Sequence, residues 1–396
     1  MTSAVIVDVV RTPSGKGKPG GALSAVHPAT LLADLLTELV RRHDLDPALV
    51  DDVIAGCVTQ AGEQAVNIAR TAVLAAGFPE SVPATTVDRQ CGSSQQAAAF
   101  AAQAIVAGSY DIAIACGVES MSRAPMFSNV GGADPTAGPL TRRYPDGLVS
   151  QGIGAELIAA RWKFDRDELD EYAARSHRLA SDARERMQRD QIVPVRTVDV
   201  AGHEVTILDD ETVRPSTTTE SLSALRPVFR DDALAARFPE IDWSITAGNS
   251  SPLTDGASAA LIMSERKAAE LGLTPRARFH SFAVSGSDPL LMLTGPIPAT
   301  EKILARTGLG LDDIDIYEVN EAFAPVPLLW QSHFDTDPAR LNPAGGAIAL
   351  GHPLGASGGR LLASMLTHLE ATGGRYGLQT MCEGGGMANA TIIERL

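Results

Sequence analysis

The amino-acid sequence predicts a layered α/β fold, and two observations carry this prediction. In the first hundred residues, short runs rich in β-branched side chains alternate with longer segments of helical pattern, as expected where strands and helices form separate layers. A similar succession of turn, helix and strand returns near the C-terminus. With 396 residues, the chain is long enough for two or three domains around a large core.

The elements of the first copy follow one another closely. Strands are expected at 4–10, 51–56 and 84–89, and helices at 28–42 and 67–76. The segment from Gln90 to Ser94 then leads into an Ala-rich stretch that favours a helix, which Gly108 is expected to end. A buried strand at 111–117 completes this copy.

The C-terminal copy has the same order of turn, helix and strand. A glycine-rich turn at 351–358 leads into a helix ended by Gly373, and a strand that begins at Tyr376 follows. Each copy places a reactive residue type in the turn before its helix, Cys91 in one and His352 in the other. Two equivalent halves that face each other would bring both turns to one central place.

The middle of the chain differs from both copies. Residues 121–245 contain loops rich in Pro, Gly and Arg, a charged helix at 166–189 and a polar stretch at 200–222, which is typical of an inserted lid. A buried-strand pattern returns at 246–264. We therefore expect a first half at 1–120 and 246–274, a lid at 121–245, and a second half at 275–396.

Composition excludes several classes of protein. A formal charge of −15 opposes binding to nucleic acid or to an anionic membrane, and no apolar run approaches the roughly 18 residues of a membrane helix. The N-terminus has no secretory pattern, so the cytoplasm is expected. The four cysteines form no CxxC pair, which indicates neither a disulfide scaffold nor a metal site.

Four residues are candidates for chemistry. Cys91 lies at a predicted helix start, where free N–H groups would stabilise a thiolate and lower its pKa, although a small buried hydrophobe is the alternative. Its flanking glycine and serines favour a tight, exposed turn. His352 lies in a glycine-rich turn that would present its side chain to a ligand. Cys382 ends a strand, as Cys116 does in the first copy, and Asn320 either orients an imidazole or a water or caps the next helix.

These elements together resemble the thiolase family. DRQCGSSQQA, NEAFAP, GGAIALGHPLGASGGR and TMCEGGGMANATIIERL occur in the family's order and spacing. The resemblance implies a five-layered αβαβα fold built from two similar halves, with a lid that binds coenzyme A. It also implies a homodimer or homotetramer and acyl-CoA substrates. No permanently bound cofactor is implied, because coenzyme A and acetyl-CoA are substrates.

The resemblance also assigns roles. Cys91 would be the acylated nucleophile, His352 its activating base with a pKa near neutrality, and Cys382 the acid/base at the substrate's α-carbon. One oxyanion pocket would consist of His352 with a water held by Asn320, and the other of the N–H groups of Cys91 and Gly384.

Coenzyme A is assigned to weaker matches outside the catalytic turns. Arg226 suits a phosphate or adenine contact, and small residues would let the pantetheine pass. The complete set of matching positions is Ser251, Ala247, Arg226 and Phe323, and Met292 matches a residue of the acyl pocket.

One departure from the family concerns the substrate. Short-chain biosynthetic thiolases have a His-Met pair where this chain has Ser150-Gln151. Several phrases are similar to actinobacterial degradative thiolases, some of which act on steroids. We therefore expect thiolytic cleavage of 3-oxoacyl-CoA in fatty-acid β-oxidation or steroid breakdown.

Three other functions stay open. One is a biosynthetic acetoacetyl-CoA thiolase, which differs in pocket size. Another is a condensing enzyme of the ketoacyl-synthase type, against which Cys382 argues. The last is a non-catalytic acyl-CoA-binding relative, which would have lost at least one reactive residue.

Overall fold

A continuous sheet forms the framework of the computed structural model, which describes residues 3–199 and 201–396. Its strand order is β10-β11-β12-β9-β1-β8-β5-β3-β4, with β2 beside β8. The strands of the first half are β1 (Ala4–Arg11), β2 (Gly15–Lys16), β3 (Asp52–Gly56), β4 (Ala84–Val87), β5 (Ile112–Ser120) and β8 (Thr254–Ser264). Those of the second half are β9 (Ala277–Gly286), β10 (Ile316–Val319), β11 (Tyr376–Glu383) and β12 (Met387–Arg395).

The two parts of the sheet have the same topology. In the first, β3 runs parallel to β5, and β5-β8-β1 continue antiparallel. In the second, β10 runs parallel to β11, and β11-β12-β9 continue antiparallel. Among the described residues, the two parts of the sheet are joined by the pairing of Val5 and Ile6 of β1 with Arg278 and Ala277 of β9. The predicted relation between the halves is therefore confirmed at the level of strand order.

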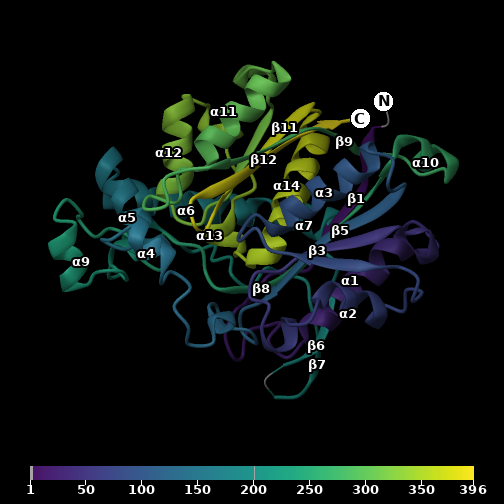
Figure 1. The fold of residues 1–396 in the computed structure, drawn as a ribbon, viewed down its shortest axis with the longest axis horizontal. Helices are drawn as coiled ribbons and strands as arrows, with labels where there is room; N and C mark the ends of the chain where they lie inside the picture. The colour runs from purple at the N-terminus through teal and green to yellow at the C-terminus, as the bar shows by residue number, and fades with distance from the viewer. Residues whose placement is uncertain (1–2, 200) are drawn as a thin grey trace.

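Helices complete five layers. Between the two parts of the sheet lie α3 (Ser93–Val106) and α14 (Ser357–Thr372), whose apolar side chains form one core with both parts (Figure 1). The outer face of the first part is covered by α1 (Pro28–Arg42) and α2 (Ile68–Ala75). The outer face of the second is covered by α11 (Pro296–Thr307) and α12 (Pro325–Phe334). This is the predicted layered α/β fold.

Two glycines allow close backbone contacts in and beside the central helix layer. A Cβ on Gly117 would lie 2.2 Å from the carbonyl oxygen of Gly355, and one on Gly358 would lie 2.2 Å from the backbone nitrogen of Gln95. Both distances are far below van der Waals contact. Gly358 therefore lets the first turns of α3 and α14 approach each other, and Gly117 lets β5 lie against the segment at Gly355.

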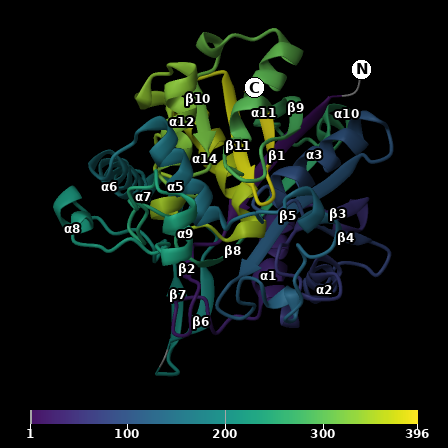
Figure 2. The same cartoon turned by 60° about the vertical axis from the view of Figure 1, so that its left-hand side comes forward.

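The inserted segment lies to one side of the layers (Figure 2). The predicted helix at 166–189 is broken at Ala183, which lets Ala180 and Met187 both pack against Ala349 and Leu350. Part of the predicted polar stretch is ordered as the second strand of a hairpin and a short helix; residue 200 lies outside the described residues. The elements here are α4 (Pro139–Arg143), α5 (Gln151–Trp162), α6 (Arg166–Asp182), α7 (Arg184–Asp190), β6 (Val195–Val198), β7 (Glu204–Ile207), α8 (Thr219–Ser223) and α9 (Asp232–Arg237).

Some predicted boundaries were wrong. The strand expected from 246 begins at Thr254, because residues 246–253 bond to the lid and to the loop after β10 instead of a strand neighbour. The strand expected to end at Gly117 continues to Ser120, since β8 pairs with it throughout. The remaining elements are α10 (Glu265–Glu270), α13 (Ala347–Leu350) and the 3-10 helices η1 (Pro47–Leu49), η2 (Gly62–Gln64), η3 (Ser128–Val130), η4 (Leu311–Asp313), η5 (Pro338–Arg340) and η6 (Leu354–Ala356). No helix among the described residues has the length and apolarity needed to cross a membrane.

Candidate active site

The turn that carries Cys91 joins β4 to α3. Gln90 adopts a positive φ of 48°, a conformation that non-glycine residues rarely occupy and that often marks a functional turn. Gly92 is required by its neighbour, because a Cβ there would lie 2.2 Å from Oε1 of Glu383. The turn is tight, as predicted, but it is not exposed: the Cys91 side chain is 3% accessible. The end of β11 covers it.

Burial dominates the ionisation of Cys91. The pKa of this thiol is raised to about 12, mainly by burial and next by the nearby Glu383 carboxyl, whereas the Cys91 N–H and the Gln151 side chain lower it. The prediction of a lowered pKa is therefore wrong in the free protein. The helix α3 begins only at Ser93, and the desolvation of the sulfur outweighs the N–H groups near it. A thiolate must be formed with the help of a base.

His352 is held in one tautomer. Its Nδ1 lies 2.6 Å from Oγ of Ser357, and that hydroxyl donates to the carbonyl of Pro353 at 2.9 Å. The hydroxyl therefore accepts from Nδ1–H, which leaves the lone pair on Nε2. Burial, with the Arg360 charge, lowers the pKa of His352 to about 3. The expectation of a pKa near neutrality is wrong, because an imidazolium would be desolvated here, so His352 is a neutral acceptor.

Asn320 contacts this imidazole directly. Its Nδ2 lies 3.3 Å from Nε2 of His352, and its backbone N–H donates to Thr380 of β11. It does not cap the following helix, since α12 begins only at Pro325. Its Oδ1 is buried and has no hydrogen-bond partner among the described residues. One amide therefore faces the imidazole while keeping a free acceptor.

Cys382 and Gly384 come from the end of β11. Burial raises the pKa of Cys382 well above its usual range, and charge on Cys91 adds to this, which means that the two sulfurs are close enough to interact. A Cβ on Gly384 would lie 2.9 Å from Oε1 of Gln90. This glycine thus lets the β11–β12 turn lie against the Cys91 turn.

The predicted meeting of the two reactive turns is confirmed. Gly355, three residues after His352, has its carbonyl against Gly117, and its N–H donates to the buried Glu119 carboxyl at 2.9 Å. The first turn of α14 packs on the first turn of α3. Cys91, Cys382, His352 and Asn320 therefore belong to one buried region between the halves.

The candidate coenzyme A residues lie along two adjoining segments. The backbone N–H of Ser251 donates to Ala322, next to Phe323, whose ring packs edge-on against Phe229 with centroids 6.0 Å apart. The remaining candidates divide by exposure: Ala247 and Arg226 are exposed, and Met292 is buried in the core around Cys382.

The two exposed candidates are neighbours in space. Pro227 and Thr246 form a β-bridge, which places the segments of Arg226 and Ala247 side by side. The Phe229 ring occupies the space where a Cβ on Gly152 would lie, at 2.3 Å. These segments therefore adjoin the start of α5, beside the buried site.

Sequence reasoning missed several polar groups here. Ser357, Gln151, Glu119 and Glu383 all contact the reactive turns. Glu383 directly follows Cys382, so a charged residue at the end of an otherwise apolar strand was the available signal. Glu119 had the same signal at the end of the first copy. The other cysteines, Cys57 and Cys116, are buried with raised pKa values, as expected for packing.

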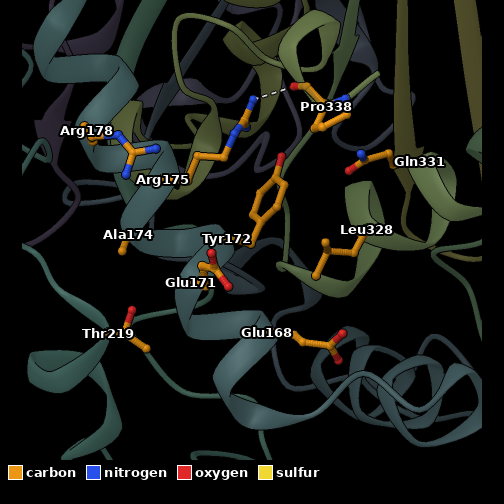
Figure 3. A pocket seen from close by; sticks show the side chains of 10 residues that line it. All are labelled: Glu168, Glu171, Tyr172, Ala174, Arg175, Arg178, Thr219, Leu328, Gln331 and Pro338. Carbon is orange, nitrogen blue, oxygen red and sulfur yellow. Dashed lines mark hydrogen bonds between the residues drawn. The ribbon is translucent and has the colours of Figure 1, made fainter. Parts of the chain in front are cut away.

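A separate cavity of about 460 Å³ opens between α6, α12 and η5 (Figure 3). Arg175 donates to the carbonyl of Pro338 at 2.7 Å on its wall. The hydroxyl of Tyr172, another lining residue, donates to Glu321 at 3.0 Å. None of the candidate catalytic residues lines this cavity, so it is distinct from the buried site.

Known proteins share both the sequence and the fold. Residues 4–266 match the family described as "Thiolase, N-terminal domain", and residues 273–395 match "Thiolase, C-terminal domain". The steroid 3-ketoacyl-CoA thiolase FadA6 of Mycobacterium tuberculosis is 49% identical over 405 residues, which cover 100% of this chain and 95% of that protein. A 3-ketoacyl-CoA thiolase of Saccharophagus degradans is 44% identical over 398 residues, covering 99% and 98%. The crystal structure of the Bacillus anthracis acetyl-CoA acetyltransferase has a TM-score of 0.88 and 39% identity, covering 100% and 99%.

Proposed function

The chain belongs to the thiolase family of acyltransferases, and we propose that it cleaves 3-oxoacyl-CoA to acetyl-CoA and a shortened acyl-CoA through a thioester on Cys91. The single observation that carries this assignment of roles is the joining of Cys91, Cys382 and the His352–Asn320 pair at the contact between the two halves. A condensing enzyme of the ketoacyl-synthase type would have no use for Cys382, and a non-catalytic relative would have no use for this convergence.

The first half-reaction forms the acyl-enzyme. Nε2 of His352 takes the proton of Cys91, and the sulfur attacks carbon 3 of the substrate. The bond between carbons 2 and 3 then breaks, and its electron pair passes to carbon 2 as the enolate of acetyl-CoA. Cys382 donates a proton to that carbon, and acetyl-CoA leaves.

The second half-reaction restores the enzyme. Free coenzyme A loses its thiol proton to a base and attacks the carbonyl carbon of the thioester on Cys91. The Cys91 sulfur departs as a thiolate and is reprotonated. The high pKa values of both cysteines in the free protein favour neutral thiols between turnovers, so charge would develop only when a substrate is present.

Two groups of donors would stabilise the negative oxygens. The N–H groups of Cys91 and Gly384 would hold the oxygen of the Cys91 adduct. The enolate oxygen would face His352 and a water held by Asn320, whose Oδ1 is a free buried acceptor. Because Nδ1 carries the proton of a neutral His352, this pocket depends on the proton that Nε2 receives from Cys91.

Coenzyme A would lie across the two exposed segments that meet near α5. Arg226 is exposed and able to contact a phosphate. Ser251 and Phe323 lie beside the Asn320 turn, where the pantetheine would enter. Met292, in the core around Cys382, would line the acyl pocket.

The substrate is proposed to be larger than acetoacetyl-CoA, with a medium-chain or ring-bearing acyl group. Support comes from the relative named a steroid thiolase. It also comes from Ser150, because serine is smaller than the His that stands at this position in short-chain thiolases. Gln151, by contrast, keeps a sizeable side chain beside the reactive turn: this side chain lowers the pKa of Cys91, and its Nε2 would lie 3.3 Å from a Cβ on Gly384. The lid residue Phe127 does not fill the space beside Ser150, because Phe127 is 72% accessible.

The second candidate is a biosynthetic acetoacetyl-CoA thiolase. The retained bulk of Gln151 at Cys91 favours it, as does the fold shared with an acetyl-CoA acetyltransferase. For either activity we propose a cytoplasmic homodimer or homotetramer, and for the first a place in fatty-acid or steroid degradation.

A panel of 3-oxoacyl-CoA thioesters with free coenzyme A tests the function. Loss of the thioester-enolate absorbance reports cleavage, and kcat/KM for acetoacetyl-CoA is compared with medium-chain and ring-bearing substrates. Each buried methylene is worth roughly 0.8 kcal/mol, so a few carbons should raise kcat/KM by orders of magnitude. A clear preference for acetoacetyl-CoA would favour the biosynthetic alternative.

A further inference from the structure

The carboxyl of Glu383 lies directly behind the nucleophile turn. Glu383 is the last residue of β11, opposite Met387, and its side chain is fully buried. Its Oε1 occupies the space where a Cβ of Gly92 would lie, at 2.2 Å. Neither carboxyl oxygen has a hydrogen-bond partner among the described residues. An ionised carboxylate without donors is costly in such a place.

Asn389 on the neighbouring strand β12 also has an acceptor without a donor. Its Nδ2 donates to the carbonyl of Gly92 at 3.0 Å, whereas its Oδ1 is buried without a partner in the described chain. That Oδ1 lies 2.9 Å from the same Cβ position on Gly92 that Glu383 approaches. Rotating the amide would turn Oδ1 toward the Gly92 carbonyl and lose the existing bond. Three buried oxygens, the two of the carboxyl and Oδ1 of the amide, therefore lack a donor among the described residues, and protonation of the carboxyl supplies one.

We propose that Glu383 carries a proton at neutral pH and donates it to Asn389 Oδ1, so that a neutral carboxyl and the amide together position the Cys91–Gly92 turn. Glu383 is then a positioning residue, which acts through the turn and not on the substrate. When this proton is lost to solvent, a carboxylate without a donor remains behind Cys91. The inference rests on the proposed function in one respect, namely that Cys91 is the nucleophile.

The charges around Glu383 support the same reading. Burial raises the pKa of Glu383 to about 8; Asp88 adds to the increase, and Arg89 opposes it. Both of those charged residues lie on the segment before Cys91. The ionised carboxyl in turn raises the pKa of Cys91 and of Cys382. Ionisation of Glu383 should therefore suppress the Cys91 thiolate.

The test compares Glu383→Gln with the natural protein. Glutamine keeps a neutral donor for Asn389 but cannot ionise. The rate of Cys91 alkylation by iodoacetamide, read by peptide mass spectrometry, is measured for both proteins from about pH 6.5 to about pH 9.5. A tenfold loss of thiolate, partly offset by the higher nucleophilicity of a more basic sulfur, leaves a net change of roughly threefold. The ratio of the variant's rate to the natural rate should rise by at least that much, with a midpoint near the Glu383 pKa of about 8.

A ratio that stays flat over this range would overturn the proposal, since Glu383 would then be ionised throughout or would not affect Cys91. Glu318→Gln is the matched control: burial raises the pKa of Glu318 to about 8 as well, but this carboxyl faces Arg360 and should leave the ratio flat. The infrared spectrum is a second measurement that does not need the Glu383 variant. With Glu318→Gln as background, one protonated carbonyl band should disappear as the pH rises through about 8, and its absence at neutral pH would contradict the inference. Alkylation requires no turnover, so a rising ratio without thiolysis would refute the proposed function and leave this inference standing.

Discussion

The ends of β5 and β11 occupy equivalent places in the two halves, and each meets the helix-start turn of the other half. Glu119 is the penultimate residue of β5. Its carboxyl accepts hydrogen bonds from the N–H groups of Val58, Thr59 and Gly355, from the side chain of Gln64 and, at 4.0 Å, from the thiol of Cys57. The penultimate residue of β11 is Cys382, followed by Glu383, whose carboxyl has no partner among the described residues.

The difference shows that two strand ends with the same place in the fold have different roles. At the end of β5, a fully bonded carboxyl fixes the turn of His352, so this strand end serves the geometry. At the end of β11, polar groups are buried but unsatisfied, and such groups can exchange protons with little structural loss. The topology is shared, whereas the chemistry lies where hydrogen bonds were left unmade.

The largest effect should come from the reactive turn itself. Cys91→Ser removes the only proposed nucleophile, and we expect kcat/KM for thiolysis to fall on the order of 10⁴-fold. Cys116→Ala, in the middle of β5, is the control and should retain most of the activity. If the two variants lost activity equally, Cys91 would not be the nucleophile.

The next largest effect should follow the loss of the amide at the imidazole. Asn320→Ala removes a group that holds the enolate-side water and contacts His352 Nε2, so kcat should fall roughly 10²-fold to 10³-fold, as for an oxyanion donor, with a smaller change in KM. Steady-state kinetics with one 3-oxoacyl-CoA substrate measures both constants. A change confined to KM would mean that Asn320 only binds substrate.

The contact between the halves can be broken without touching a reactive group. In Gly117→Ala, the new Cβ would meet the Gly355 carbonyl at 2.2 Å, and overpacking of this kind typically costs about 1–3 kcal/mol. Gly310→Ala is the control, because its nearest neighbour would be 3.6 Å away. Urea unfolding monitored by circular dichroism compares the two. Equal stability would mean that β5 and the segment at Gly355 are not held at this distance.

The smallest effect, and the sharpest comparison, concerns the two carboxyls. Glu119→Gln should lower the free energy of unfolding by about 1–3 kcal/mol at neutral pH, because the amide NH₂ replaces an acceptor for buried N–H groups. Glu383→Gln, by contrast, should raise the free energy of unfolding at alkaline pH. The folded pKa of Glu383 is raised from 4.5 to about 8, so the natural protein loses stability as the pH rises from the lower value through the higher one, by about 1.4 kcal/mol per unit.

Unfolding experiments at about pH 6 and about pH 9 measure this effect. The stability gained by Glu383→Gln over the natural protein should be larger at the higher pH. A Glu383→Gln gain that did not change with pH would show that Glu383 does not titrate in this range.

The fold was accessible from sequence because its cues are local. Ala-rich composition and a following glycine predicted α3, and Gly373 correctly ended α14. The starting point of β8 was missed because the polar residues 246–253 were joined to the apolar run that follows them, although Gly248 and Pro252 disfavour a strand; this segment bonds to the lid at Asp170 and to the loop at Ala322. The break at Ala183 was missed because it depends on packing against Leu350, far along the chain.

The reactive residues were also accessible, but their ionisation was not. Cys91 and His352 were singled out by their turns. Their pKa values moved in directions that the turns did not predict, since these values depend on desolvation by distant segments that close over the site. The tautomer of His352 depends on Ser357, which the sequence presents only as one more small residue of the glycine-rich turn at 351–358.

The most direct test of a site divided between the two halves is the acyl-enzyme itself. The natural protein, Cys91→Ser and Cys382→Ser are incubated with an acyl-CoA, and the attached acyl group is located by intact-protein and peptide mass spectrometry. The account predicts acylation of Cys91 in the natural protein and in Cys382→Ser, which should nevertheless lose most carbon–carbon cleavage, and none in Cys91→Ser. An acyl group on another residue while Cys91 stays free, or an equal loss of acyl transfer in both variants, would contradict it.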